Sequence, residues 1–305
     1  MISMDQYKGC FLGLAIGDAF GAPYEGGPLE RLLWKAIGKT KDGKLRYTDD
    51  TQMAIDLAKS FLYNSTINQD HLAHTFAESY QWSRGYGPST SQLLKLIKRG
   101  VHWKEINKKK FKTGSFGNGA AMRAPILAMC FPSNTHELLN SVIRSAEITH
   151  AHPLGIEGAK LIALATQIAF QKFSNEAILE YLFRQCDSKD YKSKITFCAE
   201  ALKQSDIKLR KIISNLGNGI AAPQSCVTAI YFSLKFRNQE FDSMLDQVIK
   251  LGGDTDTISS MAGAIWGAFN GSLSIKNKAK AVERSNEIIK FAEKLFIKQE
   301  GQPGF

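Results

Sequence analysis

The hydrophobic positions of the chain follow a helical period through most of its length. In residues 51–63, apolar side chains recur three or four positions apart between Met53 and Leu62, which predicts one buried helix face. The same period predicts helices over residues 71–82, 91–98, 120–130, 136–147, 155–171, 176–183, 195–203, 223–235, 241–251, 257–269 and 276–296. Strand-like alternation is scarce, and no repeat or long linker interrupts the pattern. We therefore predict an all-α protein, a single compact multi-helix domain over residues 1–305.

A glycine stripe near the N-terminus indicates close helix packing. Gly9, Gly13 and Gly17 stand four residues apart and would share one face of a helix. Membrane helices that dimerise use this spacing too, but the run here is short and ends at Asp18. No stretch approaches the length of a membrane span, and the N-terminus lacks a signal-peptide pattern. We expect no membrane partner and a close contact between two helices of a soluble core.

Composition adds a charge imbalance and argues against disulfides. The net charge is +10, with a local lysine cluster at Lys104, Lys108, Lys109, Lys110 and Lys112. A solvated loop, or a basic rim that attracts an anionic substrate, explains this cluster better than nucleic-acid binding, because no aromatic-interleaved basic stripe accompanies it. The five cysteines are odd in number, widely spread and set in apolar contexts. They predict buried thiols in a reducing, cytoplasmic environment.

Two acidic clusters far apart in the sequence carry the strongest chemical signal. They are YTDDT (47–51) and GGDTDT (252–257), and each precedes a predicted helix. Asp and Thr are good N-caps, but two carboxylates in each cluster exceed what capping needs. Four carboxylates brought together would repel unless cations or protons neutralised them, and an all-oxygen ligand set suits Mg²⁺, Mn²⁺ or Ca²⁺. The alternation in Asp254-Thr255-Asp256 would point both carboxylates to one side if this segment is extended.

A glycine-rich segment, GSFGNG (114–119), leads into another predicted helix. Free N–H groups at such a helix start attract anions. The segment lacks the lysine of a Walker loop and the preceding strand of a dinucleotide fingerprint. Taken alone it is an ordinary turn, but beside a metal site it suggests a cradle for a phosphate or diphosphate.

Two further segments contain candidate residues. In His150-Ala151-His152-Pro153, the proline predicts a helix boundary, which argues against a histidine metal pair. It favours a hydrogen-bonded histidine at a helix end or a contact with a ribose or base. Glu25 stands among glycines in GAPYEGG (21–27). A lone loop glutamate usually faces solvent, and the functional alternative is a mobile carboxylate over a metal site.

Together, these segments resemble the ADP-ribosylglycohydrolase family. The matching pieces occur in family order and span nearly the whole chain: GCFLGLAIGDAFGAPYEG (9–26), YTDDTQMAI (47–55), GSFGNGAAMR (114–123), ITHAHPLGIEGA (148–159) and GGDTDTISSMAGAIWGA (252–268). The resemblance implies an all-α domain whose central cleft holds two metal ions, Mg²⁺ with Mn²⁺ as the alternative. It also implies that the chain hydrolyses the glycosidic bond of an ADP-ribosylated protein or an ADP-ribose-containing small molecule and releases ADP-ribose.

The resemblance also assigns roles to residues. The family's metal ligands fall on Thr48, Asp49, Asp50, Asp254, Asp256 and Thr257. Its diphosphate loop falls on Ser115, Phe116, Gly117, Asn118 and Gly119, and its nucleoside-contacting histidine on His150. Glu25 matches the mobile glutamate of the serine-hydrolase branch. Phe116, and less strongly Phe111, offers a stacking face for the nucleoside. Glu25, Asp49 or Asp256 would act as the general base toward water, and the sequence leaves this choice open.

The linkage that is cleaved receives conflicting signals. Residues 84–87 resemble the serine-hydrolase branch, and Pro88-Ser89-Thr90 stands where the arginine-hydrolase branch often has an aspartate. Residues 150–154 instead resemble the dinitrogenase-reductase-activating glycohydrolase. We slightly favour an O-linked, serine-type substrate over N-linked ADP-ribosyl-arginine. The alternatives from other classes are a non-catalytic ADP-ribose-binding module and a metal-dependent phosphatase that acts on nucleotides.

Overall fold

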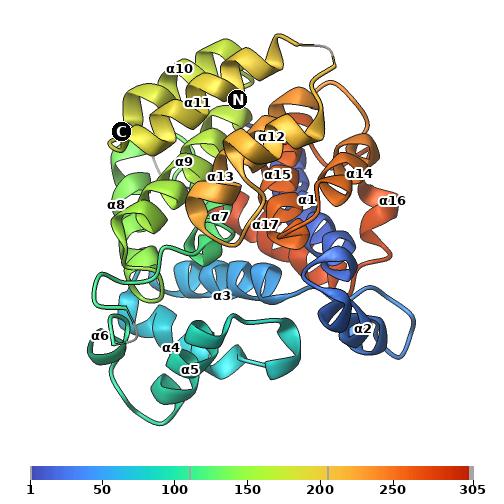
Figure 1. The fold of residues 1–305 in the computed structure, drawn as a ribbon. Coiled ribbons are helices and arrows are strands. Elements are labelled where there is room, and N and C mark those ends of the chain that lie inside the picture. Colours follow the sequence, from blue (N-terminus) through green and yellow to red (C-terminus); the bar gives the residue numbers. More distant parts are fainter. Residues whose placement is uncertain (1, 110, 205, 302–305) are drawn as a thin grey trace.

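Two glycine-lined helices, α1 (Met4–Gly21) and α15 (Thr255–Asn270), pack against each other at the centre of the structure (Figure 1). A Cβ atom added to Gly13 would lie 2.1 Å from the carbonyl oxygen of Gly263, and one added to Gly267 would lie 2.0 Å from that of Gly9. Real Cβ atoms do not approach backbone this closely, so only glycine permits the contact. The close packing predicted from the glycine stripe is confirmed.

The remaining elements surround this pair in a single compact all-α domain, as predicted. The structure is a computed structural model that describes residues 2–109, 111–204 and 206–301. In chain order, the other elements are η1 (Ala22–Tyr24), α2 (Pro28–Ile37), α3 (Asp49–Asn64), α4 (Gln69–Ser79), η2 (Trp82–Arg84), α5 (Pro88–Lys98), α6 (Trp103–Ile106), η3 (Asn118–Ala120), α7 (Ala124–Cys130), α8 (Thr135–Glu147), α9 (Pro153–Phe170), α10 (Asn175–Gln185), α11 (Lys189–Leu202), α12 (Leu209–Leu216), α13 (Ala222–Lys235), α14 (Phe241–Leu251), α16 (Lys276–Ala279) and α17 (Ser285–Glu300).

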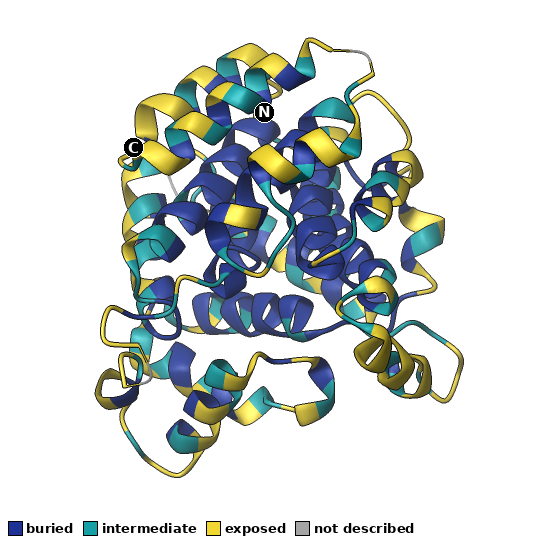
Figure 2. Cartoon of the chain, viewed as in Figure 1, coloured by how far each residue is buried: buried dark blue, intermediate teal, exposed yellow. Residues whose placement is uncertain are grey.

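The layers around the central pair position the N-termini of α3 and α15. Helices α9, α13 and α17 pack against α1 or α15, whereas α3 crosses below them and separates them from α4 and α5 (Figure 1). Figure 2 shows α1, α3, α9, α13 and α15 largely buried, and α2 exposed at the periphery. Because α3 and α15 are both held in the core, their first turns are placed by many apolar contacts.

Several predicted helix boundaries were wrong, and one predicted helix is two. Residues 276–296 form α16 and α17, because the intervening segment pairs with Leu45 instead of continuing the helix. The Leu45 N–H donates to the Ala281 oxygen at 2.7 Å, and the Glu283 N–H donates to the Leu45 oxygen at 2.9 Å. Arg284 then adopts a left-handed conformation with φ of 53°. The predicted helix over residues 71–82 ends at Ser79, and the one over residues 120–130 starts at Ala124.

Three helices, α2, α6 and α12, were not predicted. Of these, α6 is a single turn, which is too short for a helical period to appear. Helix α2 has an apolar period in its sequence but no buried residue. All five cysteines are free and buried, as predicted. Within the described residues, no helix has the length and apolar character needed to cross a membrane. Lys110 of the lysine cluster lies outside the described residues.

Candidate metal centre and substrate pocket

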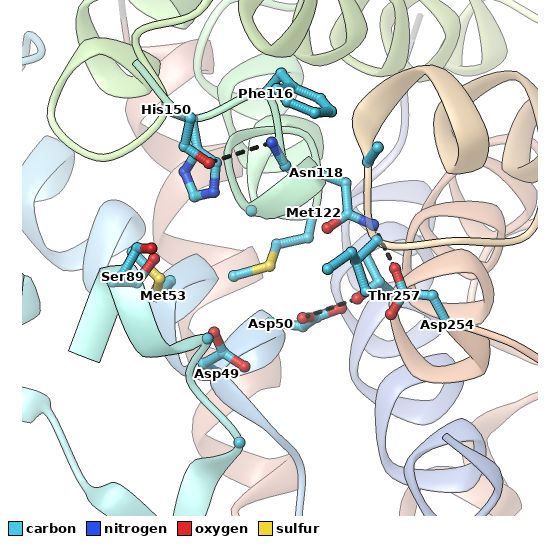
Figure 3. Close-up of a pocket in the computed structure, with 18 of the residues that line it drawn as sticks. Asp49, Asp50, Met53, Ser89, Phe116, Asn118, Met122, His150, Asp254 and Thr257 are labelled. Atoms are coloured by element: carbon cyan, nitrogen blue, oxygen red, sulfur yellow. Dashed lines mark hydrogen bonds between the residues drawn. The ribbon is translucent and has the colours of Figure 1, made fainter. Parts of the chain in front are cut away.

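The two acidic clusters meet at one cavity of about 530 Å³ (Figure 3). Asp49 and Asp50 reach it from the first turn of α3, and Asp254, Asp256 and Thr257 reach it from the start of α15. The Thr257 hydroxyl lies 3.4 Å from Asp50 Oδ1 and links the two clusters directly. The convergence expected from sequence is therefore present in the fold.

Asp18, a residue that the sequence analysis did not single out as a site residue, anchors the first cluster. It is fully buried near the end of α1 and accepts the Thr48 N–H at 2.9 Å, the Thr51 N–H at 3.0 Å and the Thr51 hydroxyl at 2.5 Å. Thr48 itself caps α3 by accepting the Asp50 N–H at 3.3 Å. Thr48 is buried but is not among the described residues that line the cavity, unlike every other predicted ligand. The signal that could have revealed Asp18 is a carboxylate at the end of an apolar glycine-striped helix.

The second cluster is a helix start, so the alternation that an extended segment would give does not apply. Gly252 and Gly253 both have positive φ, a backbone conformation that glycine adopts readily. Asp254 is the N-cap of α15, and its N–H donates to the Asn218 oxygen at 2.9 Å. The carboxylates of Asp254 and Asp256 still converge, because both lie at the start of α15 facing the cavity.

Glu25 completes the acidic group from the segment between η1 and α2. Single carboxylate oxygens of Glu25, Asp254 and Asp256 lie within 4.8 Å of one another. Burial, followed by repulsion from Asp254, raises the pKa of Glu25 to about 7. The glutamate therefore lies in the pocket wall, as in the functional alternative, and not on a solvent-facing loop.

The electrostatics of this group fit a bound cation. Burial first, and then the neighbouring carboxylates, raise the pKa values of Asp49, Asp50 and Asp256 well above the usual range. Asp50 Oδ2 and Asp256 Oδ1 are buried and have no hydrogen-bond partner among the described residues. Buried carboxylates without partners are costly unless a cation or proton compensates them. A cluster of carboxylate and hydroxyl oxygens is the donor set that Mg²⁺, Mn²⁺ and Ca²⁺ prefer.

The glycine-rich segment forms the opposite wall of the cavity. Gly114 has a φ of 86°, and a Cβ there would lie 2.6 Å from the His152 nitrogen, so the turn requires glycine. The Asn118 N–H donates to the Ile220 oxygen at 3.0 Å, and the Ala222 N–H donates to the Phe116 oxygen at 2.9 Å. Residues 115–119 are thereby fixed along the pocket, and all five line it.

Asn118 joins this wall to the acidic group. Its side-chain amide donates to Asp254 Oδ2 and, at 3.0 Å, to the Ser225 hydroxyl. The side-chain amide of Asn118 is therefore bound to a candidate metal ligand. A phosphate would have to bind other groups of residues 115–119.

The two histidines of residues 150–152 have separate positions. His150 lines the cavity, and a Cβ on Gly119 would lie 2.5 Å from its Cε1 atom. Burial, together with the nearby Arg123, lowers the pKa of His150 to about 3, so its ring is neutral at pH 7. Its Nδ1 lies 2.8 Å from the Thr149 hydroxyl. His152 instead caps α9 by accepting the Leu154 N–H at 3.1 Å, which agrees with the predicted helix boundary.

The outer rim of the cavity is apolar and carries no described carboxylate. Phe116 and Phe111 are 48% and 42% exposed there, so their rings are accessible to a planar group. A neutral wall follows, made of Gly85, Gly87, Pro88, Ser89 and Thr90. The sequence analysis assigned no role to the further lining residues Met53, Met122, Ile220, Ala221 and Gln224. Met53 and Met122 stand out in Figure 3 as the apolar part of the wall.

The lysine-rich loop lies beside the cavity. Lys109 lines a neighbouring cavity of about 300 Å³ that shares Ser89, Phe111 and Ser115 with the main one. Lysine side chains close to the pocket would attract an anionic part of a ligand.

Comparisons with known proteins identify a family and several relatives that the chain resembles. The model of the ADP-ribosylglycohydrolase family matches residues 2–304. ADP-ribosylhydrolase ARH3 from Homo sapiens and its counterpart from Bos taurus are each 33% identical to the chain, over 88% of this chain and 86% of the relative. An uncharacterized protein of Archaeoglobus fulgidus is 32% identical over 87% of each chain. A solved structure titled "ADP-ribosylglycohydrolase-related protein complex" superposes with a TM-score of 0.73 at 24% identity, over 96% of this chain and 98% of the other, and shows the same fold.

Proposed function

The chain belongs to the ADP-ribosylglycohydrolase family and is a hydrolase, and we propose that it cleaves the glycosidic bond between ADP-ribose and an O-linked, serine-type substrate with the help of two Mg²⁺ ions. The observation that carries this proposal is the convergence of Asp49, Asp50, Asp254, Asp256 and Thr257 on one cavity. The proposed substrates are ADP-ribosylated proteins or small molecules that contain ADP-ribose. The buried free cysteines support a cytoplasmic setting.

The metal ions would be held by the predicted ligands Thr48, Asp49, Asp50, Asp254, Asp256 and Thr257. The unpartnered oxygens of Asp50 and Asp256 support this assignment. When bound, the ions would orient the ribose hydroxyls and activate a water molecule. Mn²⁺ would satisfy the same oxygen ligands.

The chain's own residues would supply binding, charge and proton transfer. Residues 115–119 would hold the diphosphate, the neutral ring of His150 would contact the nucleoside part, and Phe116 would stack on it. Glycosidic cleavage develops oxocarbenium-like positive charge, which the surrounding carboxylates would stabilise. The base that takes the proton of water is one of three residues: Glu25, Asp49 or Asp256.

The neutral wall that contains Ser89 supports the O-linked choice. An arginine leaving group carries positive charge and would be matched by a carboxylate nearby. Residues 87–90, which line the cavity, contain Ser89 and no acidic side chain. A serine hydroxyl needs no such partner.

The test is release of ADP-ribose from matched serine-modified and arginine-modified peptides, each with Mg²⁺ and with excess chelator. We expect Mg²⁺-dependent release from the serine peptide. Excess chelator should lower the rate of release at least about 10²-fold, because activation of water by the metal ions is removed. Full activity in chelator would exclude the metal-dependent mechanism. Release from the arginine peptide alone would contradict the O-linked assignment and show that the enzyme cleaves the N-linked arginine bond.

Product analysis separates the alternatives. Free ADP-ribose identifies glycosidic cleavage, whereas AMP identifies cleavage of the phosphoanhydride by a phosphatase-like reaction. Binding of ADP-ribose without any product would identify a binding module. Of these alternatives, the module is the least consistent with the pocket, because binding alone does not require a group of buried carboxylates.

A further inference from the structure

A buried ion pair lies directly behind the first acidic cluster, and the proposed reaction does not use it. Arg84 ends η2, and Glu283 precedes α17, so the partners come from opposite ends of the chain. They are 4% and 8% exposed, respectively. The Arg84 guanidinium donates to Glu283 Oε1. Burying a charge is costly unless it is paired and hydrogen-bonded. The groups that this pair contacts therefore indicate its role.

The ion pair holds both backbone groups of Tyr47, the residue immediately before the first acidic cluster. The Tyr47 N–H donates to Glu283 Oε1 at 3.1 Å, and the Arg84 Nη1 donates to the Tyr47 oxygen at 2.6 Å. The Arg84 guanidinium also lies over the Tyr47 ring, 4.1 Å from its centroid. These three contacts leave the Tyr47 backbone little freedom to shift, because donor, acceptor and ring are all engaged by one pair of side chains.

The segment that carries Glu283 is itself fixed to the strand-like residues before Tyr47. Leu45 pairs with it through two backbone hydrogen bonds, at 2.7 Å to Ala281 and at 2.9 Å from Glu283. The position of Glu283 is therefore fixed by its backbone as well as by its side-chain contacts. The segment that leads into α17 thus places the Glu283 carboxylate against the Tyr47 backbone.

Two anchors thus flank the candidate ligands on α3. Asp18 binds Thr48 and Thr51 from the α1 side, and the Arg84–Glu283 pair binds Tyr47 from the α17 side. Asp49 and Asp50 lie between these anchored positions and point into the cavity. Carboxylates that repel one another, as these do, need a backbone that resists displacement.

The same arginine also reaches the neutral wall. Gly85 follows Arg84 directly, lines the cavity and has a φ of 81°. A Cβ on Gly85 would lie 3.9 Å from Asp49 Oδ1, so this wall and the acidic cluster are in close proximity. Arg84 therefore immediately precedes a pocket-lining residue in the chain, while its side chain holds Tyr47.

We propose that Arg84 and Glu283 are positioning residues that clamp Tyr47 and thereby set the geometry of the metal ligands on α3. This inference rests on the proposed function, since it assumes that Asp49 and Asp50 bind metal. It assigns a role to a C-terminal segment that touches neither substrate nor metal. Residues that orient metal ligands indirectly typically contribute 10–100-fold to metal affinity or activity.

The experiment measures the Mg²⁺ dissociation constant by titration calorimetry for wild type, Glu283→Gln and Glu283→Ala. Circular dichroism at the same temperature confirms that each protein is folded. We expect the dissociation constant to rise about 10–100-fold in Glu283→Ala. The rise should be smaller in Glu283→Gln, because the amide oxygen still accepts the Tyr47 N–H while the charge opposite Arg84 is lost.

Glu293→Gln is the matched control. Glu293 pairs with Lys8 at 2.8 Å on a half-exposed surface, so the variant loses one carboxylate charge without touching Tyr47. Its Mg²⁺ dissociation constant should equal that of wild type. Should Glu283→Ala fail to fold, Glu283→Gln and the charge-preserving Arg84→Lys decide the question by the same measurement.

A purely structural role predicts a different pattern. The Glu283 variants would then unfold at a lower temperature but bind Mg²⁺ as tightly as wild type, and this result would overturn the clamp. Failure of the proposed function is distinguishable, because wild type itself would then bind no Mg²⁺ or release no ADP-ribose. Tight Mg²⁺ binding by wild type together with weakened binding in both Glu283 variants supports the clamp.

Discussion

Two helices adjoin pocket carboxylates in the chain, and they differ in how deeply they are buried. Helix α15 carries Asp256, is buried over almost its whole length and meets α1 through glycines whose backbones touch. Helix α2 follows Glu25 and has no buried residue, and its Leu29, Leu32 and Leu33 are 76%, 64% and 52% exposed. Figure 2 shows the same contrast between a buried centre and an exposed peripheral helix.

This difference shows how one pocket can combine fixed and adjustable groups. Asp254 and Asp256 are fixed by packing that is intolerant of a single added carbon atom. Glu25 lies just before the exposed helix α2, and weakly buried segments open at low free-energy cost. Metal ligands require a fixed geometry, whereas a proton acceptor has to adjust as substrate enters. The burial pattern therefore agrees with the division of roles that we propose.

The largest expected effect comes from breaking the α1–α15 contact. In Gly263→Leu, the Cβ would lie 2.2 Å from the Gly13 oxygen, so the two helices must separate. We expect a loss of more than about 4 kcal/mol of stability, or no folded protein. Urea unfolding followed by circular dichroism measures this. Gly87→Ala is the control, because a Cβ there meets no atom within 4 Å. A folded Gly263→Leu protein of wild-type stability would contradict the rigid-core interpretation.

Removing one charge from the rigid side of the pocket should be the next largest effect. Asp256→Asn keeps the shape of the side chain but removes a ligand or base, and we expect turnover to fall about 10²–10⁴-fold. The readout is ADP-ribose release at saturating substrate and Mg²⁺. Asp242→Asn, which affects only a surface pair with Lys278 at 2.8 Å, should retain activity. Wild-type turnover by Asp256→Asn would remove Asp256 from the proposed site.

A buried carboxyl outside the pocket should give the rigid region a measurable pH dependence. Burial raises the pKa of Asp56 on α3 from 3.8 to about 7. The folded protein therefore binds this proton more tightly than the unfolded chain does, and its contribution to stability is complete below about pH 4 and lost as the pH rises through 7. The slope from this group is at most about 1.4 kcal/mol per pH unit.

Asp56→Asn tests that contribution. The amide can still accept from Gln52 and bond to Ser79, the two partners of the Asp56 carboxylate. Unfolding free energies measured between pH 5 and pH 8 should fall less steeply for the variant than for wild type. Parallel pH profiles for the two proteins would show that Asp56 titrates similarly in the folded and unfolded states.

The smallest effect is expected on α2. Leu32→Ser replaces an exposed side chain, and we expect the free energy of unfolding to change by no more than about 0.5 kcal/mol. Leu57→Ser on buried α3 provides the contrast, because it removes a fully buried leucine and should cost several kcal/mol. Both values come from the same urea titrations. A large loss in Leu32→Ser would mean that α2 is packed in solution and would remove the contrast between the two helices.

The sequence alone determined three features: the all-α class, the close packing at the glycine stripe, and which residues make up the two acidic clusters. These features are local, since a repeated apolar position or a pair of adjacent carboxylates can be read within a few residues. Helix α2 was not predicted, although Leu29, Leu32, Leu33 and Ile37 recur at helical spacing, so a local pattern was overlooked there. The break between α16 and α17 also escaped prediction, because it is caused by pairing with Leu45, more than two hundred positions earlier in the chain.

Only the tertiary structure decided what holds the acidic clusters in place. Asp18, Arg84 and Glu283 are ordinary charged residues in the sequence, and each acquires its role by being buried against the backbone of residues 47–51. Their importance comes from desolvation, because a buried charge is costly unless a partner compensates it. That partner is chosen by the packing of helices far apart in the chain, and a local sequence pattern contains no record of it.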